Sequence, residues 1–232
     1  MLAHKSRGLL DDNWRAYLRR GYQNCVLDLP GLHDDVVDRS GNGNNGVIYG
    51  ATWRRLKNSL WYLDFDGTDD QVDCGNNNVL NFTSQNFTVK FWIKFNSLAT
   101  EQYLFCRGSY NTDGWFIRHH NTVGLIIDTA QSGASQESYQ NAVTLSAGIW
   151  YHIAFVRNGA SCSIYSNGSA LSIVAGTHIN PASSAQTLKI GTSASSSSFF
   201  GGSICLESIL STTWSTSEIQ SNYNQEWHLF RV

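Results

Sequence analysis

From residue 87 to residue 95 the chain alternates between large apolar side chains and a second, mixed set. The stretch FTVKFWIKF places Phe87, Val89, Phe91, Ile93 and Phe95 on one side, with Thr88, Lys90, Trp92 and Lys94 opposite. A period of two residues is that of a β-strand with one buried face. We therefore predict a strand over residues 87–95 whose five-residue apolar face lies in the core.

Shorter apolar segments recur along the rest of the chain, separated by Gly, Asn and Ser turns at intervals of roughly ten residues. They are YLFCR, GWFIRHH, VGLIID, WYHIAFVR, SCSIYSNG, LSIV, TLKIG and GSICLESIL. Regular short strands joined by such turns are typical of a sandwich or jelly roll. The pattern predicts an all-β fold, with a short helix over residues 215–223, where Ser215 and Glu218 have the spacing of a capping box.

Residues 1–24 differ from the rest of the chain in both pattern and charge. Within SRGLLDDNWRAYLRRG the apolar residues recur at helical spacing, which predicts an amphipathic helix over residues 9–20. The segment has a net charge of +3, whereas residues 25–232 sum to −5. Two interpretations stay open: a helix packed on its own domain, or a basic arm that docks on a partner subunit. The arm would dock through Trp14, Tyr17, Leu18, Arg19 and Arg20.

Composition narrows the class of protein further. Serine, asparagine and glycine supply 68 of the 232 residues, and the net charge is −2, so the chain as a whole does not favour electrostatic binding of nucleic acid. The N-terminus lacks the apolar region of a secretory signal, and no run approaches the ~18 apolar residues of a membrane span. We expect synthesis in the cytoplasm without signal-peptide export. Five widely spaced cysteines match no metal motif, which favours buried free thiols.

Several motifs, in order, resemble a known family. VLDLPGLHDDVVDRSGNGNNGVIYGATW and LDFDGTDDQVDCGNNNVLNFTSQNFTVKFWIKF are similar to the first strands of laminin-G-like jelly rolls of the concanavalin A-like superfamily. GIWYHIAFVRNGASCSIYSNG resembles a hairpin of that family, with Asn167 where Asp is usual, and FFGGSICLESILSTTWSTSEIQSNYNQ resembles its closing strand and short helix. The resemblance covers residues 25–226 and implies a two-sheet antiparallel sandwich of about a dozen strands. It does not imply one function, because this fold hosts lectins, hydrolases and structural modules.

The stretch YLDFDGTDDQVDCG places five aspartates within ten positions. Its DGTDD segment suits a tight turn between two strands, which is our first interpretation. Calcium binding is the alternative, because DRSGNGNNG offers oxygen donors at alternate positions and Ca²⁺ prefers several oxygen ligands. The resemblance implies a structural Ca²⁺ in many relatives, often held by an Asp of the last strand, where GGSICLESIL offers only Glu207. No cofactor is expected to be required; the predicted ligands of a structural Ca²⁺ are Asp38, Asn42, Asn44, Asp66 and Asp69.

Catalytic signatures are missing from the sequence. The β-glucanases of the superfamily carry a Glu-x-Asp-x-Glu strand, and none of the five glutamates lies in such a pattern. A Gly-x-Ser-x-Gly nucleophile elbow is also missing. We therefore expect a protein that is not an enzyme. Glycan binding instead needs an aromatic platform with a few polar groups, which the RGSYNTDGWFIRHH hairpin offers in Tyr110, Trp115, His119 and His120.

Three functional hypotheses follow. The chain reads as one jelly roll behind a short basic arm, and its NYNQEWHLFRV tail resembles that of stand-alone laminin-G-like structural proteins of tailed phages. The leading hypothesis is a virion surface protein, either a capsid decoration protein or a tail-fibre module, partnered by other virion proteins or by its own copies. The second is a carbohydrate-binding module acting alone, and the third is a glycoside hydrolase.

Overall fold

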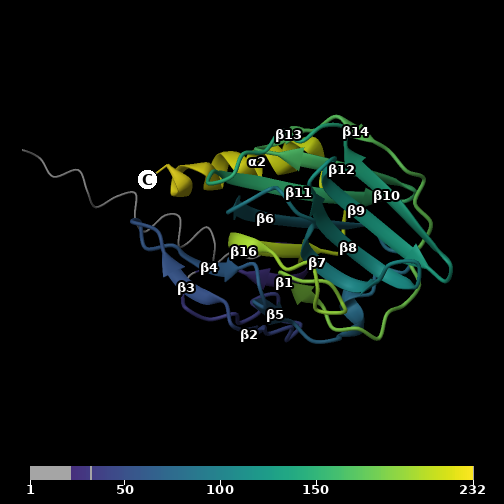
Figure 1. The fold of residues 1–232 in the computed structure, drawn as a ribbon, viewed down its shortest axis with the longest axis horizontal. Coiled ribbons are helices and arrows are strands. Elements are labelled where there is room, and N and C mark those ends of the chain that lie inside the picture. Colours follow the sequence, from purple (N-terminus) through teal and green to yellow (C-terminus); the bar gives the residue numbers. More distant parts are fainter. Residues whose placement is uncertain (1–21, 32, 232) are drawn as a thin grey trace, which may run out of the picture.

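Two antiparallel sheets pack face to face, as the sequence predicts (Figure 1). The described part of the chain forms sixteen strands, against the expected dozen, because several of them are only two to four residues long. The computed structural model describes residues 22–31 and 33–231. The helix predicted over residues 9–20 lies outside the described residues, and so do the predicted docking residues Trp14, Tyr17, Leu18, Arg19 and Arg20.

Sheet A has the order β13-β12-β11-β6-β16-β4-β3, and β1 also pairs with β16. Its strands are β1 (Cys25–Leu29), β3 (Thr52–Arg55), β4 (Trp61–Asp66), β6 (Phe87–Phe95), β11 (Trp150–Asn158), β12 (Ser161–Ser166), β13 (Ser169–Ala170) and β16 (Gly201–Leu210). A register shift between Cys205 and Ser208 interrupts β16. Its first half therefore pairs with β4, and its second half pairs with β1.

Sheet B has the order β14-β10-β9-β8-β7-β15-β5-β2. Its strands are β2 (Val47–Tyr49), β5 (Gln71–Asp73), β7 (Gln102–Ser109), β8 (Asp113–His120), β9 (Gly124–Gln131), β10 (Ala134–Gln140), β14 (Ile173–Val174) and β15 (Lys189–Ile190). A single 3-10 turn, η1 (Asn78–Leu80), connects β5 to β6. The central strands β7 to β10 form a run of hairpins, so residues close in sequence lie side by side on one surface.

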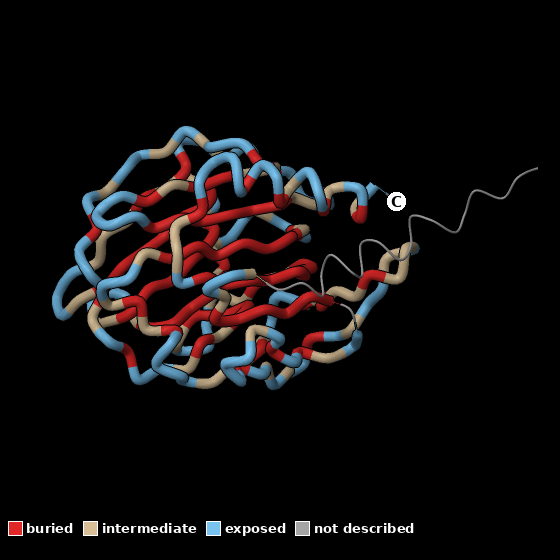
Figure 2. Tube along the Cα trace, turned by 180° about the vertical axis from the view of Figure 1, so that it is seen from behind, coloured by how far each residue is buried: buried red, intermediate tan, exposed pale blue. Residues whose placement is uncertain are grey.

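The core lies between the two sheets, where the buried segments of the strands gather (Figure 2). The five apolar residues of β6 are fully buried there, which confirms the predicted face of this strand. Sheet B contributes Leu104, Phe105, Trp115, Ile117, Leu125 and Ile127 from the other side. Burial of this many aromatic and branched side chains is the main source of stability for such a fold.

The C-terminal helix covers the outer face of sheet A. The sequence predicts this helix, but the strand pattern does not indicate which face of the sandwich it covers. Helix α2 (Thr216–Glu226) begins at Ser215 with the predicted capping box, and η2 (Trp227–Phe230) follows it. The Glu226 carboxylate accepts hydrogen bonds from Lys90 Nζ at 2.9 Å and Trp92 Nε1 at 2.7 Å. Both donors lie on the face of β6 opposite the core, so this strand is buried on both of its faces.

The start of the described chain also packs on this layer. The Tyr22 ring lies 5.2 Å from the Trp214 ring, and its hydroxyl donates to Glu226 Oε1 at 3.1 Å. Tyr22 belongs to the segment that the charge pattern assigned to the arm, and it is part of the folded body.

All five cysteines are free thiols, and four of them are buried. Burial raises the pKa of the Cys106 thiol to about 12, and it raises that of Cys162 likewise. Such thiols behave as small hydrophobic side chains rather than as nucleophiles. Among residues 22–31 and 33–231, none of the helices combines the length and the hydrophobicity needed to span a bilayer.

Candidate functional site

The five residues predicted as Ca²⁺ ligands do not assemble into one site. Asp38, Asn42 and Asn44 lie in the loop after β1, whereas Asp66 ends β4 and Asp69 lies in the turn that follows it. The loop with Asn42 and Asn44 folds back onto the start of β1, where Cys25 pairs with Leu210 at the end of β16. Asp66 instead pairs with Gly201 at the start of β16, so the two groups lie at opposite ends of that strand. The sequence could not show this, because spacing along the chain does not fix which loops meet.

The Asp38 carboxylate holds its own loop together. Its Oδ1 accepts hydrogen bonds from the backbone N–H groups of Asp28 at 3.0 Å and Ser40 at 2.9 Å. Its Oδ2 accepts from Ser40 Oγ at 2.8 Å and Asn44 N at 2.9 Å. Asn42 and Asn44 in turn donate through Nδ2 to the backbone of β1. The polar groups of these three residues thus make hydrogen bonds within the loop and to β1, which is a structural role.

The second group has the contacts of a turn and also brings three carboxylates together. Asp66 Oδ1 accepts from Thr68 N, and Asp70 Oδ2 accepts from Asp66 N, each at 2.7 Å. Carboxylate oxygens of Asp66, Asp69 and Asp70 lie within 4.8 Å of one another. Burial raises the pKa of Asp70, and the charges of its neighbours add to this effect. A cation at this turn would be held by these three carboxylates, without the loop of Asp38.

The two loops make a testable contrast. Asp38→Asn is expected to lower the free energy of unfolding by roughly 2–3 kcal/mol, because an amide nitrogen cannot accept the backbone hydrogen bonds that the carboxylate accepts. Exposed Asp69→Asn is the control and should change it little. Thermal melts with millimolar Ca²⁺ and with chelator should coincide. A Ca²⁺-dependent rise in melting temperature that Asp66→Ala abolishes would instead establish a metal site at the turn.

The four residues predicted to bind glycan divide between the two faces of sheet B. Trp115 and His119 point into the core and are both 0% exposed. The Trp115 ring lies 5.2 Å from that of Phe87, and its Nε1 donates to Leu80 O. Since successive residues of a strand point to opposite faces, these two cannot share a platform with exposed Tyr110. The prediction is wrong for Trp115 and His119, while Tyr110 and His120 lie outside the core.

The outward-facing residues of β7 to β10 build a different surface, which we call the sheet B face. Its floor consists of buried Phe116, Cys106 and Ala130, which form one small apolar cluster. Two tyrosine rings lie beside this floor: Tyr103 at 5.7 Å and Tyr110 at 6.2 Å from the Phe116 ring. Tyr110 is 51% exposed, so an aromatic ring is available to a ligand here.

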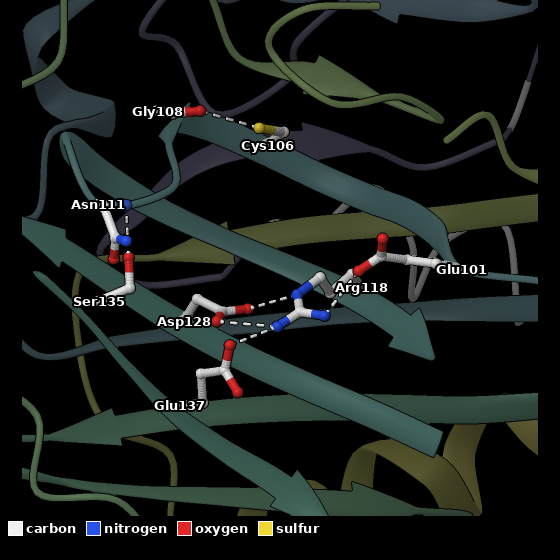
Figure 3. Close-up of polar contacts among 8 residues, drawn as sticks. All are labelled: Glu101, Cys106, Gly108, Asn111, Arg118, Asp128, Ser135 and Glu137. Carbon is white, nitrogen blue, oxygen red and sulfur yellow. Dashed lines mark hydrogen bonds and ion pairs between the residues drawn. The ribbon is translucent and has the colours of Figure 1, made fainter. Parts of the chain in front are cut away.

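Arg118 lies at the centre of the sheet B face with three carboxylates around it (Figure 3). Its Nε and Nη2 donate to the two oxygens of Asp128, at 3.0 and 3.3 Å. Its Nη2 also donates to Glu137 Oε1 at 2.6 Å, and its Nη1 donates to Glu101 Oε1 at 2.7 Å. Asp128 and Glu137 are direct cross-strand neighbours on β9 and β10. The register of the hairpins thus brings together four charged groups, from β8, β9, β10 and the residue just before β7.

Electrostatically, this cluster is acidic. Burial raises the pKa of Asp128 to about 8, although Arg118 opposes the shift. Even with Asp128 protonated, Glu101 and Glu137 outnumber the single guanidinium. The Glu137 carboxylate raises the pKa of the Tyr110 hydroxyl, because its negative charge disfavours the phenolate. The exposed Tyr110 ring therefore interacts electrostatically with the acidic cluster.

A groove of about 380 Å³ runs along the edge of the sheet B face. It is lined by Glu101, Tyr103, Cys106, Gly108, Ser109, Tyr110, Ser193, Ala194, Ser195, Ser197 and Ser198. The Ser193 hydroxyl lies within hydrogen-bond distance of those of Ser195 (3.2 Å) and Ser197 (2.9 Å). Two aromatic rings, several serine hydroxyls and the Glu101 carboxylate thus meet in a volume suited to a small polar ligand.

Sequence inspection did not single out Tyr103, Arg118, Asp128 or Glu137. One signal was present: alternation within GWFIRHH places Phe116 and Arg118 on the face opposite Trp115. A charged residue in the middle of an apolar strand needs a partner. The identity of that partner depends on the register of β9 and β10, which cannot be deduced from the sequence alone.

Comparison with known proteins identifies the family to which the chain belongs. Residues 66–220 match the model of the family described as Concanavalin A-like lectin/glucanases superfamily, and the chain belongs to that family. No curated protein sequence matches the chain.

Solved structures of similar fold include the binding domains of two toxins. That of Paraclostridial Mosquitocidal Protein 1 has a TM-score of 0.72 at 19% identity over 90% of this chain and 53% of that one. The botulinum neurotoxin serotype G binding domain has a TM-score of 0.68 at 15% identity, over 89% and 51%. A botulinum neurotoxin type C structure, whose title names interaction with two ganglioside molecules, has a TM-score of 0.65 at 17% identity, over 90% and 52%. The chain spans about half the length of these proteins, and identities this low show a shared fold alone.

Proposed function

We propose that this protein is a glycan-binding, lectin-like module whose ligand lies on the sheet B face. The observation that carries the proposal is the exposed Tyr110 ring beside an arginine–carboxylate cluster, at the edge of a hydroxyl-lined groove. An aromatic ring can pack against the apolar side of a pyranose, while carboxylates and serines bond its hydroxyls. The binding function of the similar toxin domains supports this class of activity.

The charge of the cluster specifies the class of sugar. A cluster in which carboxyls outnumber the guanidinium repels a carboxylated sugar and accepts hydrogen bonds from hydroxyl or ammonium groups. The proposed ligand is therefore a neutral or amino sugar. This preference separates the sheet B face from any ligand that is recognised through a negative charge.

A binding role is favoured over glycoside hydrolysis. Asp128 and Glu137 form a cross-strand carboxyl pair, but Asp128 is 0% exposed and both of its oxygens contact Arg118. A glycosidase needs two carboxyl groups open to the scissile bond, one as acid and one as nucleophile or base. The virion surface role stays a prediction from the sequence, and glycan binding is compatible with it.

Removing the exposed ring gives the direct test. Tyr110→Ala is expected to weaken glycan binding by about tenfold or more, because aromatic residues dominate binding energies at such sites. Tyr49→Ala is the matched control: Tyr49 is 52% exposed and lies on β2, at the far edge of the same sheet. A glycan array followed by calorimetry with the best neutral sugar measures both variants. Equal affinity of the Tyr110 and Tyr49 variants, or a ligand list made up of acidic sugars, would refute the proposal.

A further inference from the structure

We propose a second ligand site, for an acidic sugar that carries a carboxylate, in an aromatic groove on the outer side of sheet A. The groove lies beside the end of α2, near the C-terminus labelled in Figure 1. It measures about 370 Å³ and is lined by Trp92, Gly148, Ile149, Trp150, Asn167, Tyr223, Trp227, Phe230 and Arg231. Because the two sheets pack face to face, this site is separate from the sheet B face and does not depend on the function proposed there.

The aromatic walls of the groove are held in place by one another. The Phe230 ring stacks on that of Trp92 at 3.9 Å and lies 5.0 Å from that of Trp150. Trp150 in turn meets Tyr62 edge-on at 5.5 Å. Trp150, Trp227 and Phe230 are only partly buried, so part of their surface stays open to solvent. The rings therefore form a preorganised platform, which costs little conformational entropy on binding.

The charge of the groove is positive, opposite to that of the sheet B face. Arg231 lies with its guanidinium 3.9 Å from the centre of the Trp227 ring, and Lys94 Nζ lies 5.4 Å from that of Trp150. Within residues 22–31 and 33–231, neither cation makes an ion pair, and no carboxylate lines the groove. The nearby Glu226 is buried beneath it and paired with Lys90.

Aromatic walls and a positive charge together indicate which ligand the groove would bind. Stacking on Trp227 occupies the face of the Arg231 guanidinium and leaves its edge, with the N–H donors, for a planar anion. A carboxylate accepts two such hydrogen bonds side by side. The apolar side of a pyranose ring would pack on Trp150 and Phe230, as ligands do in aromatic-lined sites. A carboxylated pyranose presents both features at once, whereas a neutral sugar leaves the guanidinium unused.

Titration with two matched probes tests the site. Methyl β-glucuronide and methyl β-glucoside differ only in the carboxylate, and tryptophan fluorescence reports binding at Trp150 and Trp227. The glucuronide is expected to bind the intact chain at least about tenfold more tightly than the glucoside. Arg231→Gln, an exposed change, should remove that preference, and Trp150→Ala should weaken both probes. Arg39→Gln, an exposed arginine elsewhere, should change neither.

Separate outcomes distinguish this site from the sheet B face. Tyr110→Ala should leave glucuronide binding at the aromatic groove unchanged, so failure of one site does not imply failure of the other. Equal affinity for the two probes, or an Arg231→Gln variant that keeps the preference, would overturn the proposal. Displacement of the glucuronide by inorganic phosphate at equal concentration would also overturn it, since that result would show a contact for any anion without recognition of the sugar. Thermal melts of each variant confirm that it is folded.

Discussion

Glu226→Gln is expected to lower the free energy of unfolding on the order of 3–5 kcal/mol, the usual cost of removing one partner of a buried ion pair. Lys90 and Glu226 are 1% and 0% exposed in their side chains, and their charged atoms lie 2.9 Å apart. Burial by itself would raise the pKa of Glu226, yet Lys90 and the Trp92 hydrogen bond hold it below its ordinary value. The folded state thus keeps this carboxylate charged, and the amide cannot supply that charge to the ammonium.

The pairing between Lys90 and Glu226 is measured by a double-mutant cycle. Lys90→Met combined with Glu226→Gln should recover much of the loss, because the double variant no longer buries an ammonium whose carboxylate partner at 2.9 Å has been removed. Arg39→Met serves as the surface control: its pair with Asp35 at 3.7 Å is exposed on both sides and should contribute less than about 1 kcal/mol. Denaturant unfolding gives each value. A loss in Glu226→Gln no larger than that in Arg39→Met would show that α2 is held by its apolar contacts alone.

That ion pair also shows how far the sequence predicts this fold. Alternation over residues 87–95 correctly placed the apolar face of β6 in the core, and Ser215 with Glu218 marked the start of α2. The same alternation placed Lys90 on the side opposite the core, where it is in fact 1% exposed. Periodicity reports which residues share a face. It does not report which distant element covers that face, and here α2, about 130 residues later, does so.

The residues of the candidate sites could likewise be predicted from the sequence only in part. Tyr110 could be chosen from the sequence because a hairpin turn exposes its ring, whereas Trp115 looked equivalent and belongs to the core. A single strand cannot say which of its two faces is inside when both carry aromatic residues, as β8 does with Trp115 and Phe116. The Arg118 cluster depends on the register of three hairpins, and such long-range geometry leaves no local motif.

Arg118→Met is expected to destabilise the protein by about 1–3 kcal/mol at neutral pH, because the buried Asp128 carboxyl loses its hydrogen bonds to the guanidinium, and to abolish ligand binding at the sheet B face. The guanidinium is the only cation paired with Glu101, Asp128 and Glu137 in the described residues, and Asp128 is 0% exposed. Arg118→Lys should restore only part of the stability, because an ammonium is a point charge that cannot reproduce the planar fork that spans three carboxyls. The order of stability is therefore wild type, then Lys, then Met.

The pH dependence of Arg118→Met separates electrostatics from lost packing. Burial raises the pKa of Asp128 to about 8 in the folded protein, and Arg118 opposes that shift. Removing Arg118 raises this pKa further, so above about pH 8 the variant retains a proton that the wild-type fold has released, and its stability falls with pH relative to the wild type. Unfolding curves at neutral pH and at about pH 9 should show the difference between the two proteins widening at the higher pH. A difference that is the same at both values would mean that Arg118 acts through the packing of its side chain, and the charge argument for the sheet B face would lose its basis.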